Sequence, residues 1–379
     1  MMNVTRYLSL LLGSILLMLL MVSCAHDDED TKQPTVLTIY VYPPEKPMAT
    51  RAGDGVEGLE AESKVTKLQI WIFDHETGDR VSYLDADVSK LNNTSHSAAY
   101  ELIMPEWFII QKPNVDVYVF ANVTTATTGV AYGESDSRET LYNATLNNNF
   151  GLNSPNYPMV VLPDDGIPMT GVLQNQSIGG EAPRLYIGSG SGTVNTQLVR
   201  TTSKLQFIFG RPSNGPSLTI TDISIDEGMI PDIEYLVMPS PLTCRIGSKY
   251  NTSKTQVIDA VIPVTTSCAS PLSYVLDQED AQDYDTRIQA AITNGELTSK
   301  GPFYLRESDK RITGTISYRA GDDAVKTATF VMTKAGDFTR NHSWIVYAYY
   351  TSGNLLTITT VDVDDWEKTP DVDVDIHNW

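Results

Sequence analysis

The sequence predicts an all-β protein made of two β-sandwich domains. Short runs of alternating apolar and polar residues, rich in β-branched and aromatic side chains, recur along most of its 379 residues. Clusters of glycine, proline, asparagine and serine separate these runs, as turns require. One segment, residues 280–293, has convincing helical periodicity, so we expect one short helix, in the second domain.

The chain begins with the composition of a secretory signal peptide, which we assign to residues 1–23. An apolar run over residues 7–22 follows Arg6 and is short for a transmembrane helix, which needs about 20 apolar residues. Ser23 and Cys24 resemble a bacterial lipobox, in which the cysteine is acylated and becomes the new N-terminus. Met21 stands where that motif more often has leucine, and an ordinary signal peptide with an incidental cysteine is the alternative. Both interpretations predict export from the cytoplasm.

A strand is expected soon after this signal, over residues 35–42. Leu37, Ile39 and Val41 alternate onto one face, and the prolines that follow end the strand. Residues 49–63 form a Gly- and acid-rich linker of the kind that proteases cut, and they contain one arginine, Arg51. The plainer interpretation of Arg51 is a surface arginine without a function.

The alternating pattern resumes after the linker. The first domain should contain strands at residues 68–73, 80–84, 100–104 and 115–123, with an irregular stretch at 124–165 folded over its surface. The second domain should contain strands at residues 194–199, 204–209, 218–225, 311–318, 328–332, 343–350 and 355–363. A last segment places Val372, Val374 and Ile376 on one face and aspartates on the other, which favours a half-buried strand over a calcium site.

Residues that could carry enzyme chemistry do not fall into a recognisable pattern. The five histidines lack the spacing of a zinc site, and no nucleophile motif, phosphate loop or dinucleotide fingerprint is present. We therefore predict no enzyme activity, cofactor or metal. The net charge of −20 repels phosphate backbones, so nucleic acid is not an expected partner. With Cys24 lipidated, Cys244 and Cys268 remain, and an oxidising compartment favours a disulfide between them over two separately buried thiols.

Strands at the two ends of the chain suggest a mechanism of assembly. Cleavage after Arg51 would remove the strand at 35–42 and leave an unpaired sheet edge beside an apolar groove. A C-terminal strand of another copy could fill this groove by strand addition, which would build an open head-to-tail polymer. The candidate donor strands lie within residues 355–379, and their apolar residues are Leu356, Ile358, Val361, Val363, Val372, Val374 and Ile376.

Several short motifs occur in order across nearly the whole chain. They are the lipobox at Cys24, TRAG at residues 50–53, VTKLQIWIFD at 65–74, VYVFAN at 117–122, IPMTG at 167–171, YIGSGSG at 186–192, LVRTTSKL at 198–205, TRNH at 339–342 and VDVDDW at 361–366. Each motif is weak alone, but together and in this order they resemble the Bacteroidales fimbrillin family, the type V pilins.

This resemblance implies two transthyretin-like β-sandwich domains, which we place at residues 52–190 and 191–379, behind a lipidated pro-segment at 24–51. It also implies lipoprotein export to the outer membrane, for which the acidic residues 27–30 resemble a signal. Cys24 would be the lipidation site. A trypsin-like, arginine-specific protease would cut between Arg51 and Ala52. The exchanged strand would carry Leu37, Ile39 and Val41, and the implied partners are other pilin subunits.

The sequence therefore predicts a structural subunit of a cell-surface pilus, assembled by donor-strand exchange. The alternative is a tip adhesin or a glycan-binding outer-membrane lipoprotein, in which Trp107, Trp344 or Trp379 would stack on sugars. For Trp344, which lies in a predicted strand, packing in the core is the better explanation.

Overall fold

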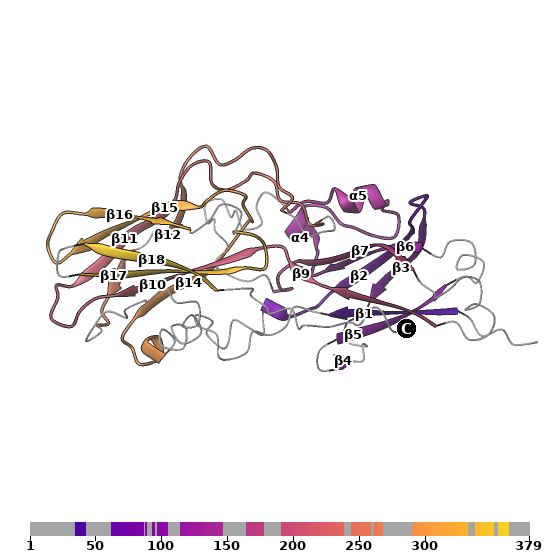
Figure 1. Ribbon diagram of the computed structural model, residues 1–379, viewed down its shortest axis with the longest axis horizontal. Coiled ribbons are helices and arrows are strands. Elements are labelled where there is room, and N and C mark those ends of the chain that lie inside the picture. The colour runs from indigo at the N-terminus through magenta and orange to yellow at the C-terminus, as the bar shows by residue number, and fades with distance from the viewer. Residues whose placement is uncertain are drawn as a thin grey trace, which may run out of the picture.

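The computed structural model describes residues 35–42, 62–86, 88, 93–94, 97–104, 114–146, 164–177, 191–238, 244–258, 261–267, 290–332, 338–351 and 355–363. In these ranges most of the regular structure is strand, which confirms the all-β prediction. The strands form four sheets, arranged as two packed pairs that lie end to end (Figure 1).

The N-terminal sandwich pairs a four-stranded sheet with a five-stranded sheet. The strand order is β4-β5-β1-β8 in the first sheet and β3-β2-β6-β7-β9 in the second. The strands are β1 (Thr35–Tyr42), β2 (Leu68–Asp74), β3 (Arg80–Ala86), β4 (Asn93–Thr94), β5 (Ser97–Met104), β6 (Asn114–Ala121), β7 (Met169–Ser177), β8 (Ser191–Gln197) and β9 (Val199–Arg200).

The C-terminal sandwich is built from the later strands. One sheet has the order β14-β10-β17-β18, and the other has the order β12-β11-β15-β16, with β13 also paired to β11. The strands are β10 (Ser203–Gly210), β11 (Leu218–Ile225), β12 (Thr255–Ile258), β13 (Ile262–Val264), β14 (Thr298–Leu305), β15 (Thr313–Ala320), β16 (Lys326–Val331), β17 (Ser343–Tyr350) and β18 (Leu356–Val363).

The boundary between the sandwiches differs from the one expected at residue 191. β8 pairs with β1 and β9 pairs with β7, so residues 191–200 complete the N-terminal sandwich. β10 then opens the second sandwich, after two residues that make a bend. The difference arises because β8 pairs in parallel with a strand more than 150 positions earlier, and local sequence carries no sign of such a contact.

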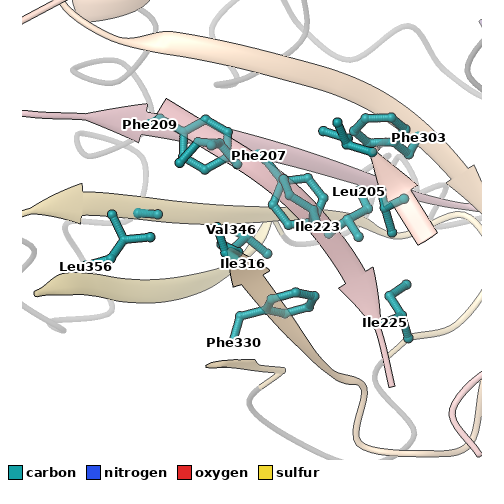
Figure 2. Close-up of a cluster of buried hydrophobic side chains, with 14 of the residues drawn as sticks. Leu205, Phe207, Phe209, Ile223, Ile225, Phe303, Ile316, Phe330, Val346 and Leu356 are labelled. Carbon is teal, nitrogen blue, oxygen red and sulfur yellow. The ribbon is translucent and has the colours of Figure 1, made fainter. Parts of the chain in front are cut away.

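Alternating side chains from both sheets of each pair form its core. In the C-terminal sandwich, Phe207 of β10 lies between Phe303 of β14 and Phe330 of β16 (Figure 2). The ring centroids of the two neighbours are 5.9 and 5.6 Å from that of Phe207, in edge-to-face arrangements. Leu356 of β18 is buried in the same core.

Helices contribute little to the described residues. α4 (Thr125–Thr128) and α5 (Arg138–Tyr142) fall in the stretch expected to be irregular, and both are too short to show a helical period. Of the helix expected at 280–293, residues 290–293 are helical, Gly295 follows with a left-handed φ of 72°, and residues 280–289 lie outside the described residues. No helix within the described ranges is long and apolar enough to span a membrane.

Candidate exchangeable strand and its anchorage

β1, the strand predicted to be exchanged, lies in the middle of its sheet. On one side it pairs antiparallel with β5, from Thr35 opposite Met104 to Val41 opposite Ala98. On the other side it pairs in parallel with β8, from Val36 opposite Ser191 to Tyr42 opposite Gln197. A central strand of this kind satisfies backbone groups on both of its edges.

The core face of β1 is fully excluded from solvent. Leu37, Ile39 and Val41 are 1%, 0% and 1% exposed. They pack against alternate residues of the facing sheet, namely Leu68, Ile70 and Ile72 of β2 and Val115, Val117 and Val119 of β6. Burying each of these aliphatic side chains contributes about 1.5–3 kcal/mol before chain entropy. β1 is therefore a main part of the N-terminal core, although it precedes the rest of the sandwich along the chain.

The two neighbours of β1 differ in how they are held. β8 is close to β7, because a Cβ added at Gly171 would lie 2.7 Å from the carbonyl oxygen of Gln197, and its chain continues into β9. β5 pairs, within the described strands, only with β1 and the two-residue strand β4. Loss of β1 would remove the strand pairing of β8 and most of that of β5, but β8 would keep its contact with β7 and its continuation into β9.

Cys24, Arg51 and Ala52 lie outside the described residues, and the chain is described again from Glu62. The Glu62 side chain is fully buried, with the Tyr304 hydroxyl donating to Oε1 at 2.5 Å and Lys204 Nζ 3.1 Å from the same oxygen. Burial lowers the pKa of Lys204 to about 7, and burial followed by the Glu62 charge raises the pKa of Tyr304. Arg200 Nε donates to the Glu62 carbonyl oxygen at 3.1 Å, which fixes the main chain as well.

The residues after Glu62 are held by Asn122, at the end of β6. Asn122 Nδ2 donates to the Lys64 carbonyl oxygen at 2.6 Å, and Asn122 Oδ1 accepts from the Thr66 N–H at 2.8 Å. The Asn122 N–H donates to the Lys67 carbonyl oxygen at 2.9 Å. Asn122 has a φ of 57°, a left-handed conformation that asparagine tolerates better than most residues. Residues 62–67, which we call the anchor segment, are therefore bound along their whole length.

A second buried cluster lies within the C-terminal half, close to its contact with the N-terminal sandwich. Arg340 Nη2 lies 2.6 Å from Glu307 Oε1 and 3.4 Å from Glu234 Oε1, and all three side chains are almost fully buried. Burial is the main cause that raises the pKa of Glu234. Nearby, the Leu236 N–H donates to the Ala144 carbonyl oxygen at 2.8 Å, so main-chain pairing also links the C-terminal half to the N-terminal sandwich.

Sequence reasoning missed Glu62, Lys204 and Glu234 as structural centres. Glu62 stood in a stretch that its composition assigns to a linker. A signal did exist, because Asn122, Arg200, Lys204 and Arg340 all belong to the short motifs on which the family resemblance rests. The structure shows that these separate motifs meet around the junction of the two sandwiches.

The described strand that carries predicted donor residues, β18, lies at the edge of its sheet, whereas β1 lies in the middle of its own. β18 is an edge strand that pairs antiparallel with β17 over its whole length, from Ser343 opposite Val363 to Tyr350 opposite Leu356. Leu356 is buried in the C-terminal core and Ile358 packs against it. The side chains of Val361 and Val363, and residues 372, 374 and 376, lie outside the described part of the structure.

Other predicted residues are placed as follows. Cys244 is a half-buried free thiol whose pKa is raised to about 12 by burial and by the nearby Glu307 and Glu234 carboxylates. Cys268 lies outside the described residues, so the disulfide stays a prediction. Trp344 is 0% exposed within the C-terminal core, whereas Trp107 and Trp379 lie outside the described residues. No group of three or more potential metal ligands occurs in the described ranges.

Comparisons place this chain beside solved fimbrial proteins. It is similar to the tip fimbrial protein Mfa3 from Porphyromonas gingivalis with C-terminal truncation, at 14% identity and a TM-score of 0.45, with 86% of this chain and 98% of that chain covered. It is also similar to a fimbrial assembly protein from Parabacteroides distasonis ATCC 8503, at 11% identity and a TM-score of 0.43, with 88% and 97% covered. The structural neighbours are Bacteroidales fimbrial proteins. No family model matches the chain, and no curated protein matches it.

Proposed function

We propose that this protein is a structural subunit of a cell-surface pilus, exported as an outer-membrane lipoprotein and assembled by strand exchange after trimming. The observation that carries the proposal is the place of β1. It is a central strand with three fully buried aliphatic side chains. Its covalent link to the rest of the protein, which begins with the anchor segment at Glu62 and which we call the body, runs through residues 43–61, and these contain Arg51.

Trimming supplies the driving force for assembly. Cys24 would carry the lipid during export, and cleavage between Arg51 and Ala52 would separate the lipid and β1 from the body. The vacated slot would expose the core faces of β2 and β6, so an apolar strand from a second copy would gain the burial that β1 loses. Of the predicted donor residues, Leu356 and Ile358 already occupy their own core. Val372, Val374 and Ile376 are thus the better candidates, because their use leaves β18 paired.

Surface polymers from cells that express the protein test this function. N-terminal sequencing should find chains that begin at Ala52, and a blot should show an SDS-resistant ladder. Arg51→Ala should abolish the ladder, whereas Arg319→Ala, which removes an exposed arginine from β15, should leave it intact. Polymers that retain residues 25–51 would contradict the proposal.

A deletion tests the donor assignment separately. Removing residues 364–379 keeps β18 and should leave a trimmed, folded monomer that does not polymerise. Polymerisation of this variant at the normal level would show that the donor lies elsewhere in the chain.

A further inference from the structure

We propose that the anchor segment, residues 62–67, protects the chain from proteases that cleave after basic residues, and so limits trimming to the part before Glu62. The inference deepens the proposed function, on which its biological setting rests. The protection itself is a property of the isolated protein. Two basic residues, Lys64 and Lys67, lie within this segment, and a cut after either would detach the N-terminus from the junction.

The side chain of Lys64 is exposed, so a protease could reach the charge that it recognises. The main chain is what such an enzyme cannot reach. Proteases bind a substrate as an extended strand, through its backbone groups. Here the Lys64 carbonyl oxygen, the Thr66 N–H and the Lys67 carbonyl oxygen are already bound to Asn122. Cleavage after Lys64 therefore requires this segment to detach first.

Detachment of the anchor segment is also opposed at its first residue, Glu62, by contacts with buried side chains of the junction. Glu62 would have to leave Lys204 and Tyr304, and the Lys204 ammonium, which is 1% exposed, would stay in the junction without its carboxylate. A buried charge that loses its partner is strongly unfavourable. Arg200 also holds Ser63, with Nη2 2.9 Å from the hydroxyl oxygen. The segment should open as a unit, and rarely.

The second contact of Thr66 adds to this hold. Its hydroxyl donates to the Asp165 carbonyl oxygen at 2.8 Å, and Asn122 Nδ2 donates to the Ile167 carbonyl oxygen at 3.0 Å. The turn before β7 is thus tied to the same asparagine. A single residue, Asn122, connects the anchor segment to two other parts of the N-terminal sandwich.

Limited digestion of the purified full-length protein with trypsin tests the proposal. Fragments are followed by intact mass and N-terminal sequencing, and a synthetic peptide of residues 58–70 gives the rate of cleavage after Lys64 in an unfolded chain. We expect the folded protein to be cut after Lys64 at least about tenfold more slowly than the peptide, because cleavage waits for local opening. Equal rates would overturn the proposal.

Two variants locate the protection. Asn122→Ala should raise the rate of cleavage after Lys64 by about tenfold, and Thr66→Val, which keeps the side-chain shape, should raise it less. Asn251→Ala is the matched control, because Asn251 also binds main-chain groups on both sides of a turn, at Met229, Ile230 and Asp226. If Asn251→Ala exposes Lys64 as much as Asn122→Ala does, the protection reflects global stability and the proposal is wrong.

The outcome is independent of pilus assembly. If the protein shows the expected protection but forms no polymer, the protective role of the anchor segment is supported and the proposed function is contradicted. If the protein polymerises while the chain is cut after Lys64 as fast as in the peptide, the proposed function is supported and the protective role of the anchor segment is contradicted.

Discussion

Lys204 and Glu62 form an ion pair across the two sandwiches, with Nζ 3.1 Å from Oε1 and both side chains excluded from solvent. Lys204 is the second residue of β10 in the C-terminal sandwich, whereas Glu62 begins the segment that leads into β2 of the N-terminal one. The pair therefore fixes the start of the body to the junction, next to the part of the chain that we propose to be removed.

Replacing one partner of this ion pair should destabilise the protein more than replacing both. Glu62→Gln leaves a buried ammonium and should lower the free energy of unfolding by about 3 kcal/mol at pH 6. Adding Lys204→Met should recover most of that loss. Urea unfolding measures both. The control is Lys254→Met, which removes an exposed ion pair in which Lys254 Nζ lies 3.3 Å from Asp226 Oδ1. This variant should change the free energy of unfolding by less than about 1 kcal/mol. A double variant as unstable as the single one would contradict this account.

The same lysine should make stability depend on pH. Its pKa falls from 10.5 to about 7 on folding, so between these values the unfolded chain binds more protons than the folded one. The free energy of unfolding should then rise from pH 7 to pH 10, by at most about 1.4 kcal/mol per pH unit from this group. Lys204→Met should remove that part of the slope in urea titrations, and an unchanged slope would rule out Lys204 as its source.

Gly171 should be needed for the approach of β7 to β8. A Cβ at this position would lie 2.7 Å from both Gln197 O and Thr196 Oγ1, so Gly171→Ala should cost about 2 kcal/mol. Gly133→Ala is the control, because nothing lies within 4 Å of its added Cβ. Thermal unfolding of the two variants checks the difference. Equal melting temperatures would show that the two sheets separate easily at this edge.

Removal of β1 should affect the strands of the N-terminal sandwich unequally. After trypsin trimming, amide exchange should increase most in β5 and β8, because in the described strands β8 pairs with β1 alone and β5 with β1 and the short β4. β2 and β6 lie side by side in the other sheet and should stay protected. Mass-resolved hydrogen exchange before and after trimming measures this. Full protection of β5 in the trimmed protein would mean that the released strand stays bound.

Local pattern predicted those strands whose alternation is complete in the sequence. Residues 218–225 and 343–350 coincide with β11 and β17, and 68–73 and 355–363 match β2 and β18 to within one residue. Their burial follows from side-chain period alone. The start of β8 differs from the predicted start by three residues, because Gly192 disfavours a strand and residues 191–193 are held in one by pairing with β1.

The buried charges could not be predicted in the same way. An isolated glutamate or lysine is expected in solvent, and Glu62 and Lys204 are 142 positions apart. Their burial depends on how the two sandwiches meet, which no window of sequence contains. Asn122 was recognised within a motif, but the motif did not predict its left-handed backbone or its contacts to the main chain of residues 64–67.

The mixed pairing of β1 has a consequence for the polarity of an assembled fibre. One neighbour of β1 runs parallel to it and the other antiparallel. A strand that entered the empty slot backwards would exchange the two ladder types but still form one of each. Hydrogen bonding alone therefore does not orient the newcomer. Its orientation must be set by side chains that fit the depressions left by Leu37, Ile39 and Val41 in their particular order of sizes.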